Sequence, residues 1–351
     1  AATVFLNNLY EYPKSQANGD DKDGGEGAPN TDHDKGAKHE LEGVDLNTPL
    51  TYADRFRIRK PGLGWEYHPP HVDGGGIERW EDPNFRQCFA SILHGNWRAH
   101  NPFSLAPRLN ARTSLYGRPN QATVFRTFQG WLALSETAPK EGTLQVFPDV
   151  VLSNAYTILR PFFTPTVDIE SEEIFSLKGW KFDITTSSFP GIRPHEGGYY
   201  GPRPTPALHP NLRLEQTMLS VPRVKPGDMV FWHCDVVHAV EREHVGVGES
   251  AGMFFISTVA FHSSSSFFLL DPDANGDDLD LNLTVMYIPA VPLTPSNKSY
   301  IQRQAETFLQ GKCPPDMPQG PGEAAFVGTG RAEDVCGEAG RRAMGLVDIV
   351  A

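Results

Sequence analysis

A histidine and an aspartate two residues apart, His71 and Asp73, have a spacing that suits metal chemistry. In a strand, residues i and i+2 point to the same side, so these two can offer a nitrogen and a carboxylate oxygen to one ion. A third ligand is expected from His238, which comes just after an apolar strand-like run. Two histidines and one carboxylate leave the other face of Fe(II) open for a cosubstrate and O2. The sequence therefore predicts a non-haem iron site at His71, Asp73 and His238.

A second His-x-Asp motif, His233-Cys234-Asp235, means that spacing alone does not decide the ligands. Together with His244 it would supply a competing triad from one short segment, a less usual way to build an oxygenase site. Context favours the first motif, because Gly74-Gly75-Gly76 follows it and leaves room at the mouth of a barrel. In the purely structural alternative, His71 is a loop residue and His238 is a buried histidine bonded to a carbonyl group.

Periodicity and turn residues favour a mainly β fold. The chain holds 33 Gly and 30 Pro, which suggests many turns and few long helices. Residues 78–95 have helical spacing, and residues 300–309 fit a short amphipathic helix. Residues 185–210 are dense in Gly, Pro and His and predict a long functional loop. Strands are expected at residues 55–59, 122–134, 143–147, 214–221 and 229–233.

Three regions are expected along the chain. Residues 1–49 form an N-terminal segment with a disordered, low-complexity loop at 14–48, which is rich in Gly, Asp and Lys and poor in aromatic residues. Residues 50–312 form the main domain, and the Pro/Gly-rich tail at 313–351 packs on it. Within the main domain, residues 251–281 change from apolar and Ser-rich to acidic, which indicates an insertion between two strands.

Charge and hydrophobicity exclude several classes of partner. The formal net charge is −12 and no Lys/Arg cluster stands out, which disfavours a nucleic-acid-binding protein. No apolar run approaches the eighteen or so residues that span a bilayer. Four cysteines lie far apart without a CxxC pair, as in a reducing compartment. A cytoplasmic protein that acts on a small molecule, without nucleic acid or membrane, is expected. Its oligomeric state stays open.

Longer blocks of sequence resemble known families. Residues 226–241, PGDMVFWHCDVVHAVE, resemble the distal-histidine signature of jelly-roll Fe(II)/2-oxoglutarate oxygenases of the phytanoyl-hydroxylase-like branch, where the second His of an H-x4-H pair is the ligand. More closely, residues 50–320 resemble the DUF1479 (YbiU-like) family through blocks such as YHPPHVDGGGIERWEDP, FRTFQGWLALSE and TVMYIPAVPL. This resemblance implies a double-stranded β-helix, a jelly-roll or cupin-like barrel with a few flanking helices. It also implies Fe(II), 2-oxoglutarate and O2.

The resemblance further implies oxidation of a small polar molecule by hydroxylation, desaturation or ring closure. An amino acid or a secondary-metabolite intermediate is the hypothesis for this substrate. In the wider superfamily, an Arg on the strand after the distal His holds the far carboxylate of 2-oxoglutarate, but residues 250–255 and 283–289 contain none. Candidates for binding the cosubstrate are Arg126, Gln129, Arg160 and Arg242. Candidates for facing the substrate, from a loop at 189–204, are Arg193, His195, Tyr199 and Tyr200.

Two other classes of function remain open. A cupin-like metalloenzyme would use the same barrel and metal for hydrolysis or isomerisation without 2-oxoglutarate, and the missing arginine favours it. A non-catalytic β-barrel binding module would have lost its metal, which the intact His71, Asp73 and His238 disfavour. Metal content separates the binding module from the enzymes, and dependence on 2-oxoglutarate separates the two enzymes.

Overall fold

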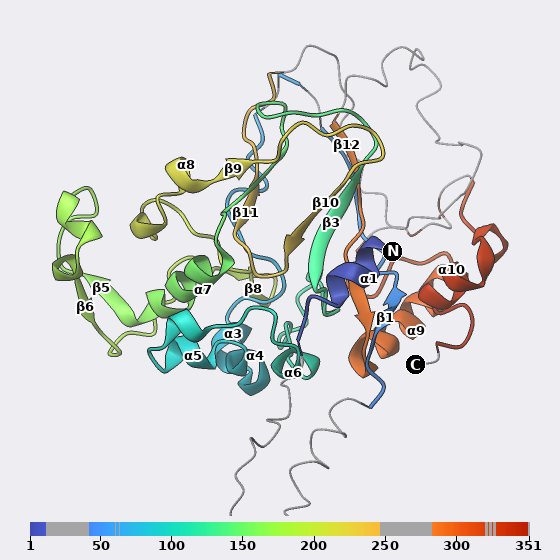
Figure 1. The fold of residues 1–351 in the computed structure, drawn as a ribbon, viewed down its shortest axis with the longest axis horizontal. Helices are drawn as coiled ribbons and strands as arrows, with labels where there is room; N and C mark the ends of the chain where they lie inside the picture. The colour runs from blue at the N-terminus through green and yellow to red at the C-terminus, as the bar shows by residue number, and fades with distance from the viewer. Residues whose placement is uncertain are drawn as a thin grey trace, which may run out of the picture.

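The structure is a computed structural model that describes residues 1–11, 42–59, 61–62, 64–245, 283–319, 322, 325 and 328–349. In this part of the chain, two antiparallel sheets form the centre, and short helices pack below and beside them (Figure 1). The described residues therefore combine sheets with more helix than the sequence predicts. The expected insertion at 251–281 lies outside the described residues.

The larger sheet has four strands in the order β10-β3-β12-β2. They are β2 (Phe56–Arg59), β3 (Phe128–Ala133), β10 (Met229–His233) and β12 (Leu283–Tyr287). The smaller sheet has the order β11-β4-β9. It consists of β4 (Leu144–Val146), β9 (Leu219–Ser220) and β11 (His238–Val240). An isolated antiparallel bridge from His71 to His238 adds a further segment beside β11.

The strand pairs of the two sheets are nested along the chain. β2 pairs with β12, His71 with His238, β3 with β10, and β4 with β9. The chain is thus folded as one long hairpin whose successive segments alternate between the sheets. Among the described residues the sheets do not close into the barrel that the sequence predicts. The strands of the smaller sheet are only two or three residues long, and the bridge at His71 is a single pair.

One face of the larger sheet carries the apolar residues next to the site. Alternation along β3 places Gln129 and Trp131 on the same face, and the register sets Gln129 opposite Trp232 of β10. Trp131, Trp232 and Val285 are buried in one apolar cluster. Arg57 of β2 shares this face because it lies opposite Val285 of β12. A cation is therefore placed on the apolar side of the sheet.

The helical segment expected at 78–95 forms three short helices below the sheets (Figure 1). They are α3 (Glu78–Glu81), α4 (Pro83–Gln87) and α5 (Ala90–Leu93). Asp82 has an extended backbone that ends α3, and its carboxylate accepts a hydrogen bond from the Phe85 amide of α4 at 2.8 Å. Pro83 fits the first position of the new helix because that position needs no amide donor. Phe85 and Phe89 pack toward α7 (Val150–Leu159) in one buried cluster.

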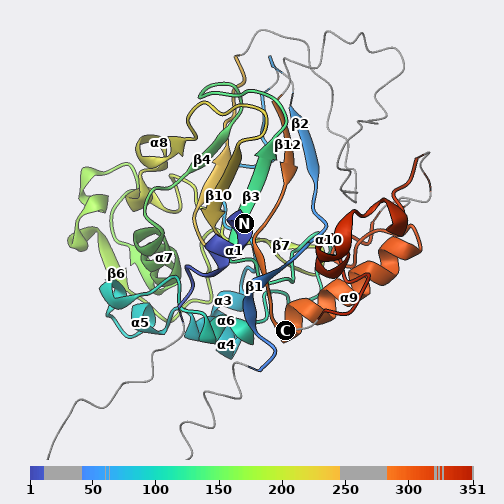
Figure 2. The same ribbon diagram turned by 45° about the vertical axis from the view of Figure 1, so that its right-hand side comes forward.

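A second group of elements lies to the right of β3 in Figure 1, with α9 and α10 at the right-hand edge of the molecule in both views (Figures 1 and 2). It includes α1 (Ala2–Asn7), β1 (Asp45–Leu50), β13 (Val291–Leu293), α9 (Pro295–Leu309) and α10 (Gly337–Ala343). β1 pairs with β13, so the end of the loop expected to be disordered at 14–48 is ordered. The reason is apolar burial, because Leu46 and Leu50 are 7 % and 5 % exposed. Thr294 caps α9, which begins five residues before the expected helix at 300–309.

The remaining elements are short. They are α6 (Ala106–Leu109), β5 (Phe163–Pro165), β6 (Trp180–Phe182), β7 (Pro194–His195), β8 (Gly198–Tyr199) and α8 (Leu214–Thr217). Single 3-10 turns occupy Trp97–Ala99, Arg160–Phe162, Glu172–Phe175, Leu177–Gly179, Pro210–Leu212 and Ala332–Asp334. The prediction of a strand at 214–221 is wrong for the first half of that range, which forms α8. The helix follows Arg213, whose backbone is left-handed (φ 47°). No described helix has the length and apolar character that a transmembrane span requires.

One histidine far from the metal motif is buried as a neutral group. His209 is 1 % exposed, and its Nδ1 accepts a hydrogen bond from the Thr205 amide at 3.3 Å. Burial, with Arg160 nearby, lowers its pKa to about 3. In the unfolded chain this pKa is near 6.5. Below pH 6.5 the unfolded state therefore binds a proton that folded His209 refuses, so the free energy of unfolding falls as the pH drops.

We predict that replacing His209 removes part of this acid sensitivity. In the wild type, this one group contributes a loss of about 1.4 kcal/mol per pH unit below 6.5. His209→Gln should therefore give a shallower pH dependence of the unfolding free energy, measured in urea at pH 7, 6 and 5. His94→Gln, at an exposed position, is the matched control. Equal slopes for wild type and His209→Gln would contradict this assignment.

Candidate metal centre

His71 and His238 are brought together by the backbone. Each donates its amide hydrogen to the other's carbonyl oxygen at 2.9 Å, which makes them a hydrogen-bonded antiparallel pair. Residues opposed in this way project their side chains to the same face. Their ring centroids are 4.3 Å apart. One backbone bridge therefore fixes the distance between two histidines that are 167 positions apart in the sequence.

The Nε2 atoms of His71 and His238 are the ring nitrogens available to a metal, because each Nδ1 is occupied by a carbonyl group. His71 Nδ1 lies 2.6 Å from the carbonyl oxygen of Pro69, and His238 Nδ1 lies 3.0 Å from that of Val236. A carbonyl oxygen can only accept, so each ring carries a hydrogen on Nδ1, and in the neutral form of either ring Nε2 keeps a lone pair. Metal-ligating histidines are commonly held in this way. Burial and the neighbouring His238 lower the pKa of His71 to about 4, so His71 is neutral at pH 7.

Asp73 completes the cluster. Its two carboxylate oxygens lie 3.7 Å from His71 Nε2 and 3.5 Å from His238 Nε2. Two atoms that are each about 2.1 Å from one ion lie at most about 4.2 Å apart, so these spacings suit a shared ion. Burial alone would raise the pKa of Asp73, but the two imidazoles outweigh it and hold that pKa well below its usual range. The Asp73 side chain is 43 % exposed, which leaves the site open on this side.

The loop after the motif is held by Arg79 of α3. Its guanidinium donates to the carbonyl oxygens of Asp73 at 3.0 Å and Gly75 at 3.3 Å, and to the carboxylate of Asp235 at 2.9 Å. Gly75 has a positive φ of 99°, and a Cβ there would meet Phe85 at 2.7 Å. The triple-glycine segment therefore lets the chain turn tightly enough for two of its carbonyl groups to accept hydrogen bonds from Arg79.

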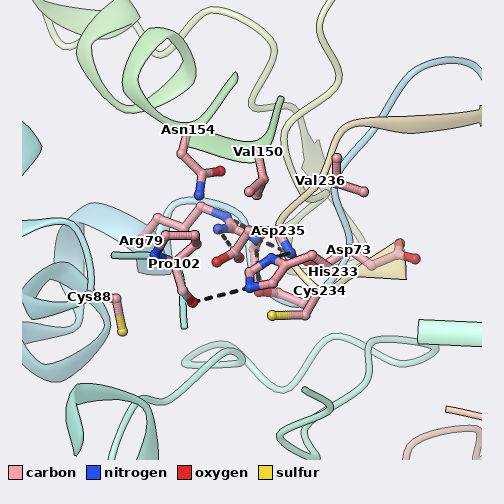
Figure 3. A network of polar contacts seen from close by, with 12 residues as sticks. Asp73, Arg79, Cys88, Pro102, Val150, Asn154, His233, Cys234, Asp235 and Val236 are labelled. Atoms are coloured by element: carbon pink, nitrogen blue, oxygen red, sulfur yellow. Dashed lines mark hydrogen bonds and ion pairs between the residues drawn. The ribbon is translucent and has the colours of Figure 1, made fainter. Parts of the chain in front are cut away.

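The second His-x-Asp motif is a structural network instead of a metal site. Asp235 is bonded by both Arg79 and Arg108, and all three side chains are almost fully buried. His233 Nδ1 accepts from the Asp235 amide at 3.1 Å, while its Nε2 faces the Pro102 carbonyl oxygen at 3.1 Å. Neither ring nitrogen is left for a metal. Figure 3 shows this network, with the Asp73 carboxylate turned away from it.

His244 does not join either cluster. It lies beyond the end of β11, where its backbone forms a bridge to Glu141. The competing triad of His233, Asp235 and His244 is therefore not assembled. In the part of the chain that the structure describes, the two groups able to hold a metal are the His71 cluster and the His233-Cys234-Asp235 segment. In the second group, the ring nitrogens of His233 and the carboxylate of Asp235 are already bonded to protein groups, so the His71 cluster is the better candidate for a metal site.

Two of the four residues expected to bind the cosubstrate lie beside the cluster. Gln129 is 4 % exposed, and its buried Nε2 has no hydrogen-bond partner among the described residues. It lies opposite Trp232, whose ring centroid is 5.2 Å from that of His238. Arg126 is buried, and its charge helps to lower the pKa of Asp73. Its charge is shared with Asp54, 3.9 Å away.

The other two expected cosubstrate residues are held elsewhere. Arg160 donates to the carbonyl oxygens of Leu208 and Phe163, both at 2.7 Å, and stacks over Trp180. The side chain of Arg242 is 76 % exposed and pairs with Glu66 at the surface. The structure therefore does not bring Arg160 or Arg242 to the metal cluster. The sequence could not show this, because both arginines flank strands as a binding residue would.

The four residues expected to face the substrate lie on or beside the β7–β8 hairpin. Arg193 is exposed, and His195 stacks on Tyr200 with ring centroids 4.2 Å apart. Tyr199 contacts Tyr116 edge-on at 5.6 Å. This segment packs directly on the metal loop, because Val72 donates its amide hydrogen to the Pro202 carbonyl oxygen at 2.8 Å. The hairpin therefore covers the loop that carries His71 and Asp73.

Arg57 is a site residue that the sequence predictions missed. Trp65 Nε1 donates to His68 Nδ1 at 2.9 Å, so neutral His68 carries its hydrogen on Nε2. Burial and the charge of Arg57 lower the pKa of His68 to about 2, which keeps it neutral. His68 Nε2 lies 3.3 Å from the Arg57 guanidinium, so two N–H groups face each other. The alternation of residues 55–59 indicated which face Arg57 occupies, but not that this face is the inner one.

Trp232 was also missed as a polar residue. In the part of the chain that the structure describes, its buried indole Nε1 lacks a hydrogen-bond partner, like Nε2 of Gln129 on the opposing strand. Buried donors are nearly always paired in proteins, so two orphan donors side by side indicate a missing acceptor. Tryptophan in an apolar strand usually belongs to the core, and no sequence signal distinguishes this one.

The chain belongs to the Gig2-like (DUF1479) family, whose profile matches residues 31–346. It is 29 % identical over 299 residues to YbiU of Escherichia coli K12, a protein described as uncharacterised. That match covers 85 % of this chain but only 56 % of YbiU, so the chain spans about half the length of this relative.

Solved structures agree with the family assignment. GlcNAc Inducible Gene 2 (GIG2) from Candida albicans is 32 % identical with a TM-score of 0.66, covering 86 % of this chain and 57 % of that one. A Salmonella typhimurium LT2 protein, named provisionally as an oxidoreductase, is 26 % identical with a TM-score of 0.64. The match covers 98 % of this chain and 63 % of the Salmonella chain.

We predict that Arg79→Met both destabilises the fold and weakens metal binding. Breaking a buried ion pair by removing one partner costs about 3–5 kcal/mol of unfolding free energy, measured in urea. Loss of a group that orients a ligand lowers metal affinity by about 10–100-fold. Arg223→Met removes an exposed pair with Glu136 and should cost less than about 1 kcal/mol. If Arg79→Met matched Arg223→Met in both measurements, the anchoring role of Arg79 would be wrong.

Proposed function

We propose that this protein is an Fe(II)/2-oxoglutarate-dependent oxygenase that oxidises a small polar molecule. The observation that carries the proposal is the cluster of His71, Asp73 and His238, with both Nε2 lone pairs and a carboxylate converging on one point. Two histidines and one carboxylate with open positions are the usual ligand set of non-haem Fe(II) oxygenases. The provisional name of the Salmonella relative is in accord with an oxidoreductase.

The nested strand pairing supports the jelly-roll part of the proposal. A jelly roll is a long hairpin wrapped so that its paired segments alternate between two sheets. The pairs β2–β12, His71–His238, β3–β10 and β4–β9 follow that pattern. In such a fold the two histidines come from paired segments of the smaller sheet, and the facing larger sheet covers the cosubstrate.

Three residues on the inner face of the larger sheet fit 2-oxoglutarate. Nε2 of Gln129 and Nε1 of Trp232 are buried donors that find no acceptor in the described ranges, and 2-oxoglutarate is rich in acceptor oxygens. We assign its far carboxylate to Arg57, because within the described residues the Arg57 guanidinium has no acceptor and faces the N–H of neutral His68. A carboxylate there would accept from the guanidinium and from His68. Arg126 is less suited, because its charge already serves Asp54.

The protein's own contribution is positional. Bound Fe(II) and 2-oxoglutarate would supply the oxidising power by activating O2. His71, His238 and Asp73 would hold the ion, and the carbonyl groups of Pro69 and Val236 would keep the two imidazoles in the ligating tautomer. Trp131 and Trp232 would exclude water from the inner side, since both are buried there.

We predict that Arg57→Gln selectively weakens 2-oxoglutarate binding. Losing a charge-assisted pair of about 1.5–3 kcal/mol should lower the affinity at least about tenfold. Calorimetric titration of Mn(II)-loaded protein with 2-oxoglutarate measures this without turnover. Arg242→Gln, which removes an exposed arginine, should leave the affinity unchanged.

The same titration separates the competing functions. Binding in the wild type that is lost in Arg57→Gln but kept in Arg242→Gln and Arg126→Gln supports the assignment. If Arg126→Gln alone abolished binding, the cosubstrate anchor would be Arg126 instead. If the wild type held Mn(II) but no 2-oxoglutarate, a cupin-like metalloenzyme would replace the oxygenase.

A further inference from the structure

Three arginines contact Tyr200, beside the metal loop, two through their guanidinium groups and one through its backbone. The guanidinium carbon of Arg203 lies 3.8 Å from the ring centroid, and that of Arg118 lies 4.9 Å from it. Arg193 is joined to the same residue, because its carbonyl oxygen accepts the Tyr200 amide at 2.9 Å. His195 stacks on the ring at 4.2 Å. One aromatic side chain therefore organises two cations, and the backbone of a third arginine, Arg193, is fixed to the same residue.

The three arginines lack acidic partners among the described residues. None of them takes part in an ion pair within 4.0 Å in that part of the chain, and Nε of Arg118 is buried without a hydrogen-bond partner. Two acidic side chains of this region are already engaged, since Glu196 pairs with His195 at 3.5 Å and Glu81 accepts from the Tyr116 hydroxyl. Burial and the charges of Arg193 and Arg118 lower the pKa of Arg203, in accord with their mutual repulsion.

The arginine group is continuous with the metal loop. A Cβ on Gly76 would meet the Tyr200 carbonyl oxygen at 2.3 Å, and a Cβ on Gly201 would meet the Val72 carbonyl oxygen at 1.9 Å. Such contacts are possible only for glycine, so the two backbones run against each other. The charge of the Asp73 carboxylate opposes the lowering of the Arg203 pKa, although no ion pair within 4.0 Å joins the two side chains among the described residues. A metal ion bound by Asp73 would neutralise this negative charge and leave the arginines without a counter-charge.

We propose that Arg118, Arg193 and Arg203 form the site for an anionic group of the substrate, a carboxylate or a phosphate, beside the metal cluster. That the bound anion belongs to the substrate rests on the proposed function. The existence of an anion site does not. Arginine suits both anions because its planar fork donates two parallel hydrogen bonds. The ring of Tyr200 holds two of the guanidinium groups in place, so less freedom is lost on binding. The substrate is therefore a small acid instead of a neutral polar molecule.

The test measures anion binding separately from metal chemistry. Metal-free protein is titrated with inorganic phosphate and, in a second arm, with malonate, and binding is followed by calorimetry. We expect one of the two to bind and Arg203→Gln and Arg118→Gln each to weaken it about tenfold. Arg203→Lys should restore part of the affinity, and Arg223→Gln, at a remote exposed pair, should have no effect. The preferred anion tells a carboxylate from a phosphate substrate.

Two results would overturn the inference. The first is that neither anion binds to the wild type, either metal-free or loaded with Zn(II). The second is that Arg203→Gln binds as tightly as Arg223→Gln. Failure of the proposed function would look different, because the wild type would then bind no Fe(II) or no 2-oxoglutarate whatever the anion titration gave. Circular dichroism of each variant shows whether it has folded.

Discussion

The buried guanidinium of Arg79 holds the two halves of the metal cluster in one place. It binds the carbonyl oxygens of Asp73 and Gly75 on one side and the carboxylate of Asp235 on the other. Asp235 is three residues before His238, and Asp73 is two residues after His71. One side chain thus joins the loop that carries two ligands to the turn that leads to the third. The reciprocal backbone bridge between His71 and His238 sets the separation, and Arg79 sets the course of the chain on either side of it.

This constraint explains why the chain contains two His-x-Asp motifs with different roles. A buried arginine needs a buried carboxylate, and Asp235 supplies one that Arg79 shares with Arg108. The strong favourable charges keep the pKa of Asp235 far below its usual range despite its burial. Asp73, by contrast, has its carboxylate near two imidazoles and partly open to solvent. Identical spacing therefore gives a structural anchor in one case and a candidate metal ligand in the other, and the difference is the pair of arginines.

The grouping of His71, Asp73 and His238 could be predicted from the sequence. Strand alternation relates the first two, and the family resemblance adds the third from a distant strand. The sequence was not enough for Arg57, whose role depends on its register against Val285 and on the tautomer of His68. Arg160 and Arg242 looked equally suitable in sequence, and only their carbonyl and surface partners exclude them. The helix expected at 78–95 was broken by the Asp82 cap, and Leu46 and Leu50 order a strand in a stretch whose composition suggested disorder.

The central claim is that His71, Asp73 and His238 hold Fe(II) together with 2-oxoglutarate. Anaerobic titration of metal-free protein with Fe(II) and 2-oxoglutarate tests it directly, through the visible charge-transfer band of the chelate. We predict a band in the wild type that is absent in His71→Ala and His238→Ala and present in His94→Ala, an exposed control. A wild type that binds no Fe(II), or a band of full strength in His71→Ala and His238→Ala, would contradict the account.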